Sequence, residues 1–279
     1  MKENVPVETI HLFPVLDKLL IDLLRSLTAE EWNKPTIAKL WSVKDIAAHL
    51  LDTNYRTISN NRDKYFGPAP TGIHSYADLV NYLNKLNMDW TSSFKRVSPQ
   101  VLIELLESGG KEFCEVMKNL APFDKAVYSV AWAGQDESYN WFHIAREYTE
   151  KFIHQQQIRD AVNKQALFTK ELFFPFIDTF MYGLPHTYRD TVATNGAVIQ
   201  IKVTTDIGSE WYLEKTPANW QLNKQADLSK VVTTVTIDPD TAWKLFSKGI
   251  TPLKAMEMVT ITGDKELGAV ALNMVSVMA

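Results

Sequence analysis

The sequence is short of cysteine, of long apolar runs and of excess positive charge, and each shortage excludes a class of protein. A single cysteine, Cys114, excludes an internal disulfide and fits a reducing compartment. The 29 Lys and Arg residues against 33 Asp and Glu give a formal net charge of −4, so nucleic acid is not expected as a partner. The longest apolar runs, 172–184 and 267–279, are too short or too interrupted for the about 20 residues of a membrane span. The first ten residues lack the apolar core of a signal peptide, and we therefore expect a cytoplasmic protein with no membrane partner.

The first half of the chain has the pattern of long helices. The composition is ordinary for globular proteins, with 46% apolar and 22% charged residues, and 279 residues suffice for two domains. Apolar spacing, capping residues and Pro or Gly breakers predict helices over residues 11–26, 42–65, 75–97, 98–120 and 139–162. Long helices with apolar stripes bury those stripes against one another, which predicts a helical bundle.

After about residue 167 the pattern changes to one of short strands. A helix over 170–182 is followed by runs rich in Val, Ile, Thr and Trp, which predict strands at 197–205, 210–214, 219–223, 230–237 and 258–262. A helix is expected from Asp238, and another from Asp264 to the C-terminus. Strands followed by helices predict an α+β domain with an antiparallel sheet. We place the domains at residues 1–165 and 166–279.

The helix over 139–162 carries a stripe of groups that can bind a metal ion. Glu150 and His154 lie four residues apart, so their Cβ atoms are expected roughly 6 Å apart, close enough to hold one ion. His49 lies in the helix over 42–65, and we predict that it joins Glu150 and His154 in a three-ligand metal site. Three protein ligands leave positions open, as in reactive sites, and a single cysteine excludes a closed thiolate cage. Two imidazoles and a carboxylate suit zinc, nickel, cobalt, manganese or iron.

The same periodicity allows a plainer interpretation. The stripe of Glu150 and His154 lies nearly opposite the apolar stripe of its helix, and His49 lines up with Asp52 and Arg56. Two polar stripes are usually solvated faces held by pairs four residues apart. They can instead face each other across a wet site, and spacing alone does not decide between the two arrangements.

Two segments resemble a known family. The stretch from Leu40 to Leu50, LWSVKDIAAHL, resembles the signature of the DinB-like metal-dependent bundles, specifically the N-terminal domain of mycothiol-dependent maleylpyruvate isomerases. The later pattern of Arg146, Glu150 and His154, each four residues apart, is similar to the second element of that branch. The β-rich half is similar in layout to the second domain of the family, which resembles sterol-carrier proteins.

The resemblance implies a fold and a reaction. The fold would be a DinB-like four-helix bundle followed by a sterol-carrier-like α+β domain. His49, Glu150 and His154 would bind the metal, with zinc expected and water completing its shell. A low-molecular-weight thiol would serve as cosubstrate and react as a thiolate with a small electrophile, in a thiol S-transferase or an isomerase like the maleylpyruvate enzymes. The alternative from another class is a non-enzymatic module that holds an apolar ligand in the second domain.

Two arginines are candidates for binding a substrate carboxylate. Arg56 and Arg146 have this chemistry, although ion pairs with Asp52 and Glu150 are the simpler account. The second half has no arginine beyond Arg189, so only lysines are available there for a dicarboxylic substrate.

Three further residues are placed near the predicted ligands. Gln157 stands where many relatives carry an Asp, so the group that supports His154 is expected to differ here. His143 and Glu147 either support the ligands or form an alternative pair one turn earlier. Their position on the polar stripe favours a third interpretation, that both are surface residues.

Cys114 is expected to be a buried small hydrophobe.

Overall fold

The protein is described by a computed structural model that covers residues 4–277. The chain divides into two compact units. Among the described residues, the first unit contains 4–128 and 139–166, and the second contains 129–138 and 167–277. The segment 129–138, which the sequence analysis assigned to the first domain, thus groups with the second unit.

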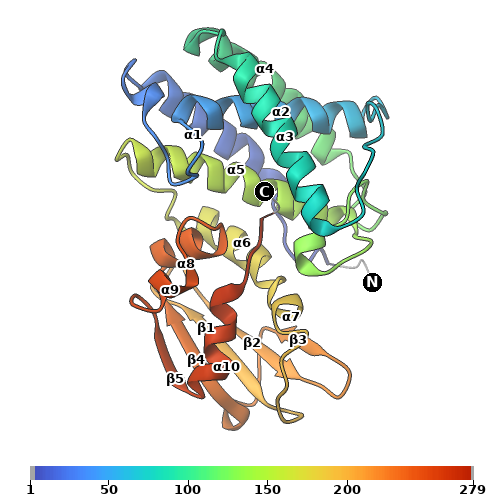
Figure 1. Cartoon of the computed structure of the whole chain (residues 1–279), viewed down its shortest axis with the longest axis vertical. Helices are drawn as coiled ribbons and strands as arrows, with labels where there is room; N and C mark the ends of the chain where they lie inside the picture. Colours follow the sequence, from blue (N-terminus) through green and yellow to red (C-terminus); the bar gives the residue numbers. More distant parts are fainter. Residues whose placement is uncertain (1–3, 278–279) are drawn as a thin grey trace. The chain divides into compact units, whose positions relative to one another are not determined.

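The first unit is helical, as predicted (Figure 1). Its helices are α1 (Phe13–Arg25), α2 (Val43–Asn61), α3 (Tyr76–Phe94), α4 (Pro99–Lys118) and α5 (Asn140–Ala161), with 3₁₀ turns at Ile10–Leu12 and Glu31–Asn33. Helix α1 packs against α4 and α5, and α2 packs against the same two helices. Helix α3 lies against α2. The apolar faces of α1, α2 and α4 form a common core, in which buried leucines and isoleucines predominate.

A capping box fixes the start of α2. The Ser42 hydroxyl accepts a hydrogen bond from the backbone N–H of Asp45, and the Asp45 carboxylate accepts one from the backbone N–H of Ser42 at 3.0 Å. These two bonds satisfy amide groups that have no partner inside the helix. Because the first residue of α2 is fixed, the direction in which His49 leaves the helix is fixed as well.

Helix α5 is buried on its polar side as well as on its apolar side. Tyr148 on the apolar stripe is 0% exposed, and Glu147 on the polar stripe is 4% exposed. Lys151 donates to Asp17 of α1 at 3.0 Å and to Asn54 of α2 at 2.9 Å. The polar stripe of α5 therefore packs inside the helical unit, and the interpretation of that stripe as a solvated face is wrong.

The second unit is an α+β unit, and the predicted order of a helical region followed by α+β structure is confirmed. Its strands are β1 (Val198–Val203), β2 (Glu210–Lys215), β3 (Trp220–Asn223), β4 (Val231–Ile237) and β5 (Thr260–Gly263). Its helices are α6 (Lys170–Met181), α7 (Leu184–Thr187), α8 (Pro239–Phe246), α9 (Pro252–Ala255) and α10 (Lys265–Ala269), with 3₁₀ turns at Ala131–Ala133, Leu228–Lys230 and Val270–Asn273. Helix α10 packs on β4 and β5 (Figure 1).

The sheet is mixed, which corrects the expectation of an antiparallel sheet. Within the described residues its strand order is β3-β2-β1-β4-β5, and β1 pairs with β4 in parallel while the other neighbours are antiparallel. After β3 the chain crosses to the far side of β1 and enters β4 in the same direction as β1. Alternation of apolar and polar residues predicts which face a side chain occupies, but it carries no information on the direction of the neighbouring strand.

The inward face of the sheet is apolar and its other face is polar. Ile201 lies opposite Trp211 on β2 and Val235 on β4, and all three are at most 2% exposed. On the other face Gln200 lies opposite Tyr212 and accepts a hydrogen bond from Thr234 at 2.9 Å, which gives the alternation predicted from the sequence.

The predicted C-terminal helix is shorter than expected. Helix α10 ends at Ala269, a 3₁₀ turn follows, and Met274 is extended. The N–H of Ser276 donates to the carbonyl of Phe246 at 3.1 Å, so tertiary hydrogen bonding replaces the helix there. The remainder of that prediction, residues 278–279, lies outside the described part of the chain. In the part that is described, every helix is too short or too polar to cross a bilayer.

Candidate metal centre

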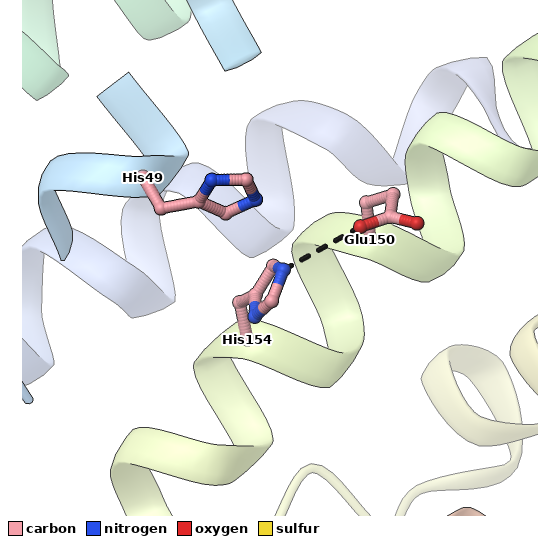
Figure 2. Close-up of side chains that lie close together, drawn as sticks. All are labelled: His49, Glu150 and His154. Carbon is pink, nitrogen blue, oxygen red and sulfur yellow. Dashed lines mark ion pairs between the residues drawn. The ribbon is translucent and has the colours of Figure 1, made fainter. Parts of the chain in front are cut away.

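The three predicted ligands meet between helices α2 and α5. His49 extends from α2 toward Glu150 and His154, which lie one turn apart on α5 (Figure 2). Each residue places one potential ligand atom within 4.8 Å of those of the other two. Among the described residues, this is the group of His, Cys, Asp or Glu side chains that lie close enough to share a metal ion. Nε2 of His154 is 3.4 Å from a carboxylate oxygen of Glu150. The ring centroids of His49 and His154 are 4.7 Å apart.

The hydrogen bond between His154 and Gln157 defines which nitrogen of His154 is free to bind a metal ion. Nδ1 of His154 lies 2.9 Å from Oε1 of Gln157, and an amide oxygen can only accept, so Nδ1 carries the proton. Nε2 of His154 then presents a lone pair to the carboxylate of Glu150, an arrangement that is stable only with a proton or a metal ion between them. His49 is buried, Asn87 forms a side-chain hydrogen bond with its ring, and its Nδ1 has no hydrogen-bond partner among the described residues. Because a ligand atom of His49 lies within 4.8 Å of ligand atoms of Glu150 and His154, the residues fit a bound cation.

Burial and neighbouring charges hold the centre in a form suited to ligation. Burial lowers the pKa of His49 well below its usual value, and the positive charges of His154 and Arg56 lower it further. Burial acts to raise the pKa of Glu150, but the hydrogen bond and charge that His154 supplies when its ring is doubly protonated, together with Arg146, leave it below its usual value. A bound cation would take the place of the proton on Nε2. A neutral imidazole and an ionised carboxylate are the protonation states that bind metal ions.

The two nearby arginines have different partners. Arg56 forms the expected ion pair with Asp52, at 2.8 Å. Arg146 donates to the carboxylate of Glu147 and lies 3.0 Å from Nδ1 of His143, a partner set that the sequence analysis did not predict.

His143 and Glu147 are buried, so their interpretation as surface residues is wrong. They are 2% and 4% exposed, and Nδ1 of His143 is 3.9 Å from Oε1 of Glu147. Burial, aided by the positive charge of Arg146, lowers the pKa of His143 to about 3. The guanidinium of Arg146 contacts both side chains, so the three residues form a buried polar cluster on α5, one turn before Glu150 and His154.

Trp41 is a member of the site that sequence reasoning missed. Its indole lies against both imidazoles, with ring centroids 4.7 Å from His49 and 5.7 Å from His154. The available signal was its position, because a large apolar residue directly before a helix N-cap often packs against the first turns of that helix.

The chain thus belongs to the class of two-unit proteins in which a helical unit, here with two imidazoles and a carboxylate close together, is followed by an α+β unit. The family model described as "Mycothiol maleylpyruvate isomerase N-terminal domain" matches residues 15–159, just over half of the chain. The chain therefore belongs to this family.

Solved structures extend the likeness over both units. The chain is similar to a crystal structure of the mycothiol-dependent maleylpyruvate isomerase, with a TM-score of 0.55, 10% identity and coverage of 91% of each chain. It is also similar to a histidine-to-alanine mutant of that enzyme, with a TM-score of 0.52, 10% identity and the same coverage. At this identity the likeness shows the fold. No curated protein matches the sequence.

Proposed function

We propose that the protein is a metal-dependent enzyme that uses a low-molecular-weight thiol to isomerise or modify a small electrophile. The observation that carries this proposal is that ligand atoms of His49, Glu150 and His154 lie within 4.8 Å of one another. The family match supports it, because the relatives that match over the whole fold bear the name mycothiol-dependent maleylpyruvate isomerase.

Each residue of the centre has a distinct task in this proposal. His49 and His154 would bind the ion through imidazole nitrogens, and Glu150 through its carboxylate. Gln157 holds the proton on Nδ1 of His154, which keeps the other ring nitrogen free for the metal. A bound divalent ion would supply a Lewis acid that lowers the pKa of a coordinated thiol.

Zinc is the ion that we propose for the centre. Zinc commonly binds histidine and carboxylate ligands, and its catalytic sites keep three protein ligands and an open position. The same ligand types also bind nickel, cobalt, manganese and iron. Ligand chemistry therefore favours zinc but does not exclude these four metals. The single cysteine, Cys114, is compatible with the reducing cytoplasm in which small thiols remain reduced.

Arg56 is the residue that we propose for binding a carboxylate of the electrophile. Its side chain is 47% exposed, whereas its partner Asp52 is only 11% exposed. A guanidinium has five N–H donors, and one acidic partner leaves several of them for a second carboxylate. Arg146 is 16% exposed and is bound to Glu147, which gives it a supporting role for the cluster beside the ligands.

Turnover with a panel of thiols tests the proposal. Zinc-loaded protein is incubated with an electrophilic unsaturated acid and with mycothiol, glutathione or cysteine in turn. We expect consumption or isomerisation of the acid with at least one thiol, loss of this activity with a chelator, and its return when zinc is restored. The exposed variant His74→Ala should keep the activity and His154→Ala should lose it. Turnover that survives the chelator would refute the metal-dependent mechanism.

One observation favours a second candidate, a module that binds an apolar ligand. A cavity of about 300 Å³ in the second unit is lined by Leu245, Ile250, Pro252, Leu272 and Met274, among others. This volume is at the lower end for ligand sites. Buried aromatic side chains, including Trp211 and Trp243, fill the core of the unit, so an apolar ligand would have to bind in this cavity and not in the core. Mass spectrometry of extracts from purified protein tests this candidate, which requires a co-purifying apolar molecule.

A further inference from the structure

Trp41 is held in place by the short loop that precedes α2. Its backbone carbonyl accepts hydrogen bonds from the N–H and the hydroxyl of Thr36, at 3.1 and 2.8 Å. Its own N–H donates to the carbonyl of Ala38 at 2.7 Å. Pro35 and Ser42 pair as an isolated β-bridge on either side of these contacts. Several bonds therefore fix the backbone of Trp41 before the helix begins.

The Trp41 side chain turns into the helical unit while its neighbour points to solvent. Leu40 is 93% exposed, whereas the half-buried Trp41 packs against the core of the first unit. Its indole meets the rings of His49 and His154 at interplanar angles of 45° and 36°. These two imidazoles also contact each other edge to face. The three rings thus form one packed group, in which the indole touches both imidazole ligands.

Packing of this kind matters because an imidazole ring turns easily about its last side-chain bond. That torsion is broad and roughly two-fold, so an unrestrained ring can turn over and put a carbon where a ligand nitrogen should lie, Cδ2 in place of Nδ1 and Cε1 in place of Nε2. Gln157 restrains the ring of His154 through Nδ1. For the ring of His49, Nδ1 has no hydrogen-bond partner among the described residues, and a side-chain hydrogen bond with Asn87 acts on the imidazole. The indole of Trp41 packs against this ring as well, with ring centroids 4.7 Å apart, and adds a second restraint.

We propose that Trp41 is the positioning residue of the metal centre and holds both imidazoles in the orientation that binds the ion. This inference rests on the proposed function. Without the indole, the two rings must be ordered when the metal binds, and that ordering costs affinity. The aromatic face also favours the partial positive charge that the imidazoles gain on a metal ion.

Cobalt(II) binding tests this role of Trp41. Calorimetry measures the affinity of the protein for the ion, and quenching of tryptophan fluorescence reports whether an indole lies beside the bound ion. Apo-protein is titrated with cobalt chloride for wild type, Trp41→Phe, Trp41→Leu and the control Trp90→Phe, whose tryptophan stacks on Phe94 at 4.7 Å. We expect Trp41→Leu to bind about tenfold more weakly and Trp41→Phe within about threefold of wild type. Quenching should fall in both Trp41 variants and persist in Trp90→Phe.

The outcomes separate this inference from the proposed function. Wild-type protein that binds no cobalt refutes the proposed function and the inference with it. Wild-type binding with unchanged affinity in a folded Trp41→Leu variant overturns the inference and leaves the function standing. If circular dichroism shows that Trp41→Leu does not fold, the Trp41→Phe variant decides, because undiminished quenching there shows that the indole is not beside the ion.

Discussion

Nδ1 of His154 and the side-chain oxygen of Gln157 lie 2.9 Å apart, one turn apart on α5. This hydrogen bond selects the tautomer and the orientation of a ring that faces Glu150 with its other nitrogen. In the proposed metal centre, a neutral amide therefore holds the ring of His154, where a carboxylate would increase the basicity of the imidazole.

Two substitutions of Gln157 should differ in their effect on zinc affinity, because one removes the hydrogen-bond acceptor and the other keeps it. Gln157→Leu removes the acceptor, and we expect zinc affinity to fall about tenfold or more, because groups that orient a ligand histidine commonly contribute this much. Gln157→Glu supplies a stronger, charged acceptor, so its affinity should equal or exceed that of wild type. Competition with a chromophoric chelator measures both values. Equal affinity in Gln157→Leu and wild type would show that this contact does not support the ligand.

Lys151 should be important for the stability of the helical unit. Its ammonium is 3% exposed and binds Asp17 and Asn54, so it links α1, α2 and α5. Lys151→Met leaves the carboxylate of Asp17 without its partner, and we expect the free energy of unfolding to fall by about 2–3 kcal/mol. Urea denaturation measures the change. Lys18→Met, at an exposed ion pair on α1, is the control and should change stability by less than about 0.5 kcal/mol.

Asp238, the N-cap residue of α8, should stabilise the folded protein by an amount that depends on pH. The Asp238 carboxylate accepts from the N–H groups of Asp240 and Thr241, both at 3.0 Å. Burial acts to raise the pKa of Asp238, but these hydrogen bonds and that of the Thr241 hydroxyl leave it below its usual value. At neutral pH, Asp238→Ala should therefore reduce the free energy of unfolding by about 1 kcal/mol.

The sign of the pH dependence follows from the lowered pKa of Asp238. The contribution of the ionised carboxylate is complete above the unfolded-state pKa of about 3.9 and is lost as pH falls through the folded-state value. The difference between wild type and Asp238→Ala should shrink in acid, as measured by urea denaturation over a pH series. A difference that stays constant into acid would show that the charge of Asp238 does not contribute.

Cys114 should react slowly in the native protein. Burial, together with the negative charge of Asp17, raises the pKa of its thiol to about 12. At pH 8 about one molecule in ten thousand then carries the reactive thiolate, against a sizeable fraction for an ordinary thiol of pKa about 8.5. Labelling with a chromogenic disulfide should be at least about a hundredfold slower in buffer than in denaturant. Comparable rates would show that this thiol is ionised in the folded state.

Local sequence signals predicted the helices that carry the site. The capping box at Ser42 and Asp45 and the uninterrupted helical pattern from Asn140 to Ala161 depend on residues close together in the chain. They are therefore visible without a tertiary structure. The strands were predicted for the same reason, but not the parallel pairing of β1 with β4, because a period of two does not specify the partner of a strand.

Periodicity could not show that the polar stripe of α5 is buried. A stripe of charged residues usually faces water, and this rule gave the wrong environment for His143 and Glu147. Here the buried polar side chains form hydrogen bonds with one another and with side chains of other helices. Lys151, for example, donates to Asp17 and Asn54. The family resemblance, and not the spacing, selected His49 as the third member of the site. The position of Trp41 before the N-cap indicates packing on the first turns of α2, but its contact with His154 of α5 is visible only in the folded structure.

The metal content of purified protein tests the central claim most directly. Wild type and the variants His49→Ala, Glu150→Ala, His154→Ala and His74→Ala are loaded with zinc, desalted and measured by mass spectrometry of the metal, with circular dichroism as the check on folding. We predict about one ion per chain in wild type and in the exposed control His74→Ala, and loss of the ion in the three ligand variants. Retention of the ion in all three ligand variants, or its absence from wild type, would contradict the account.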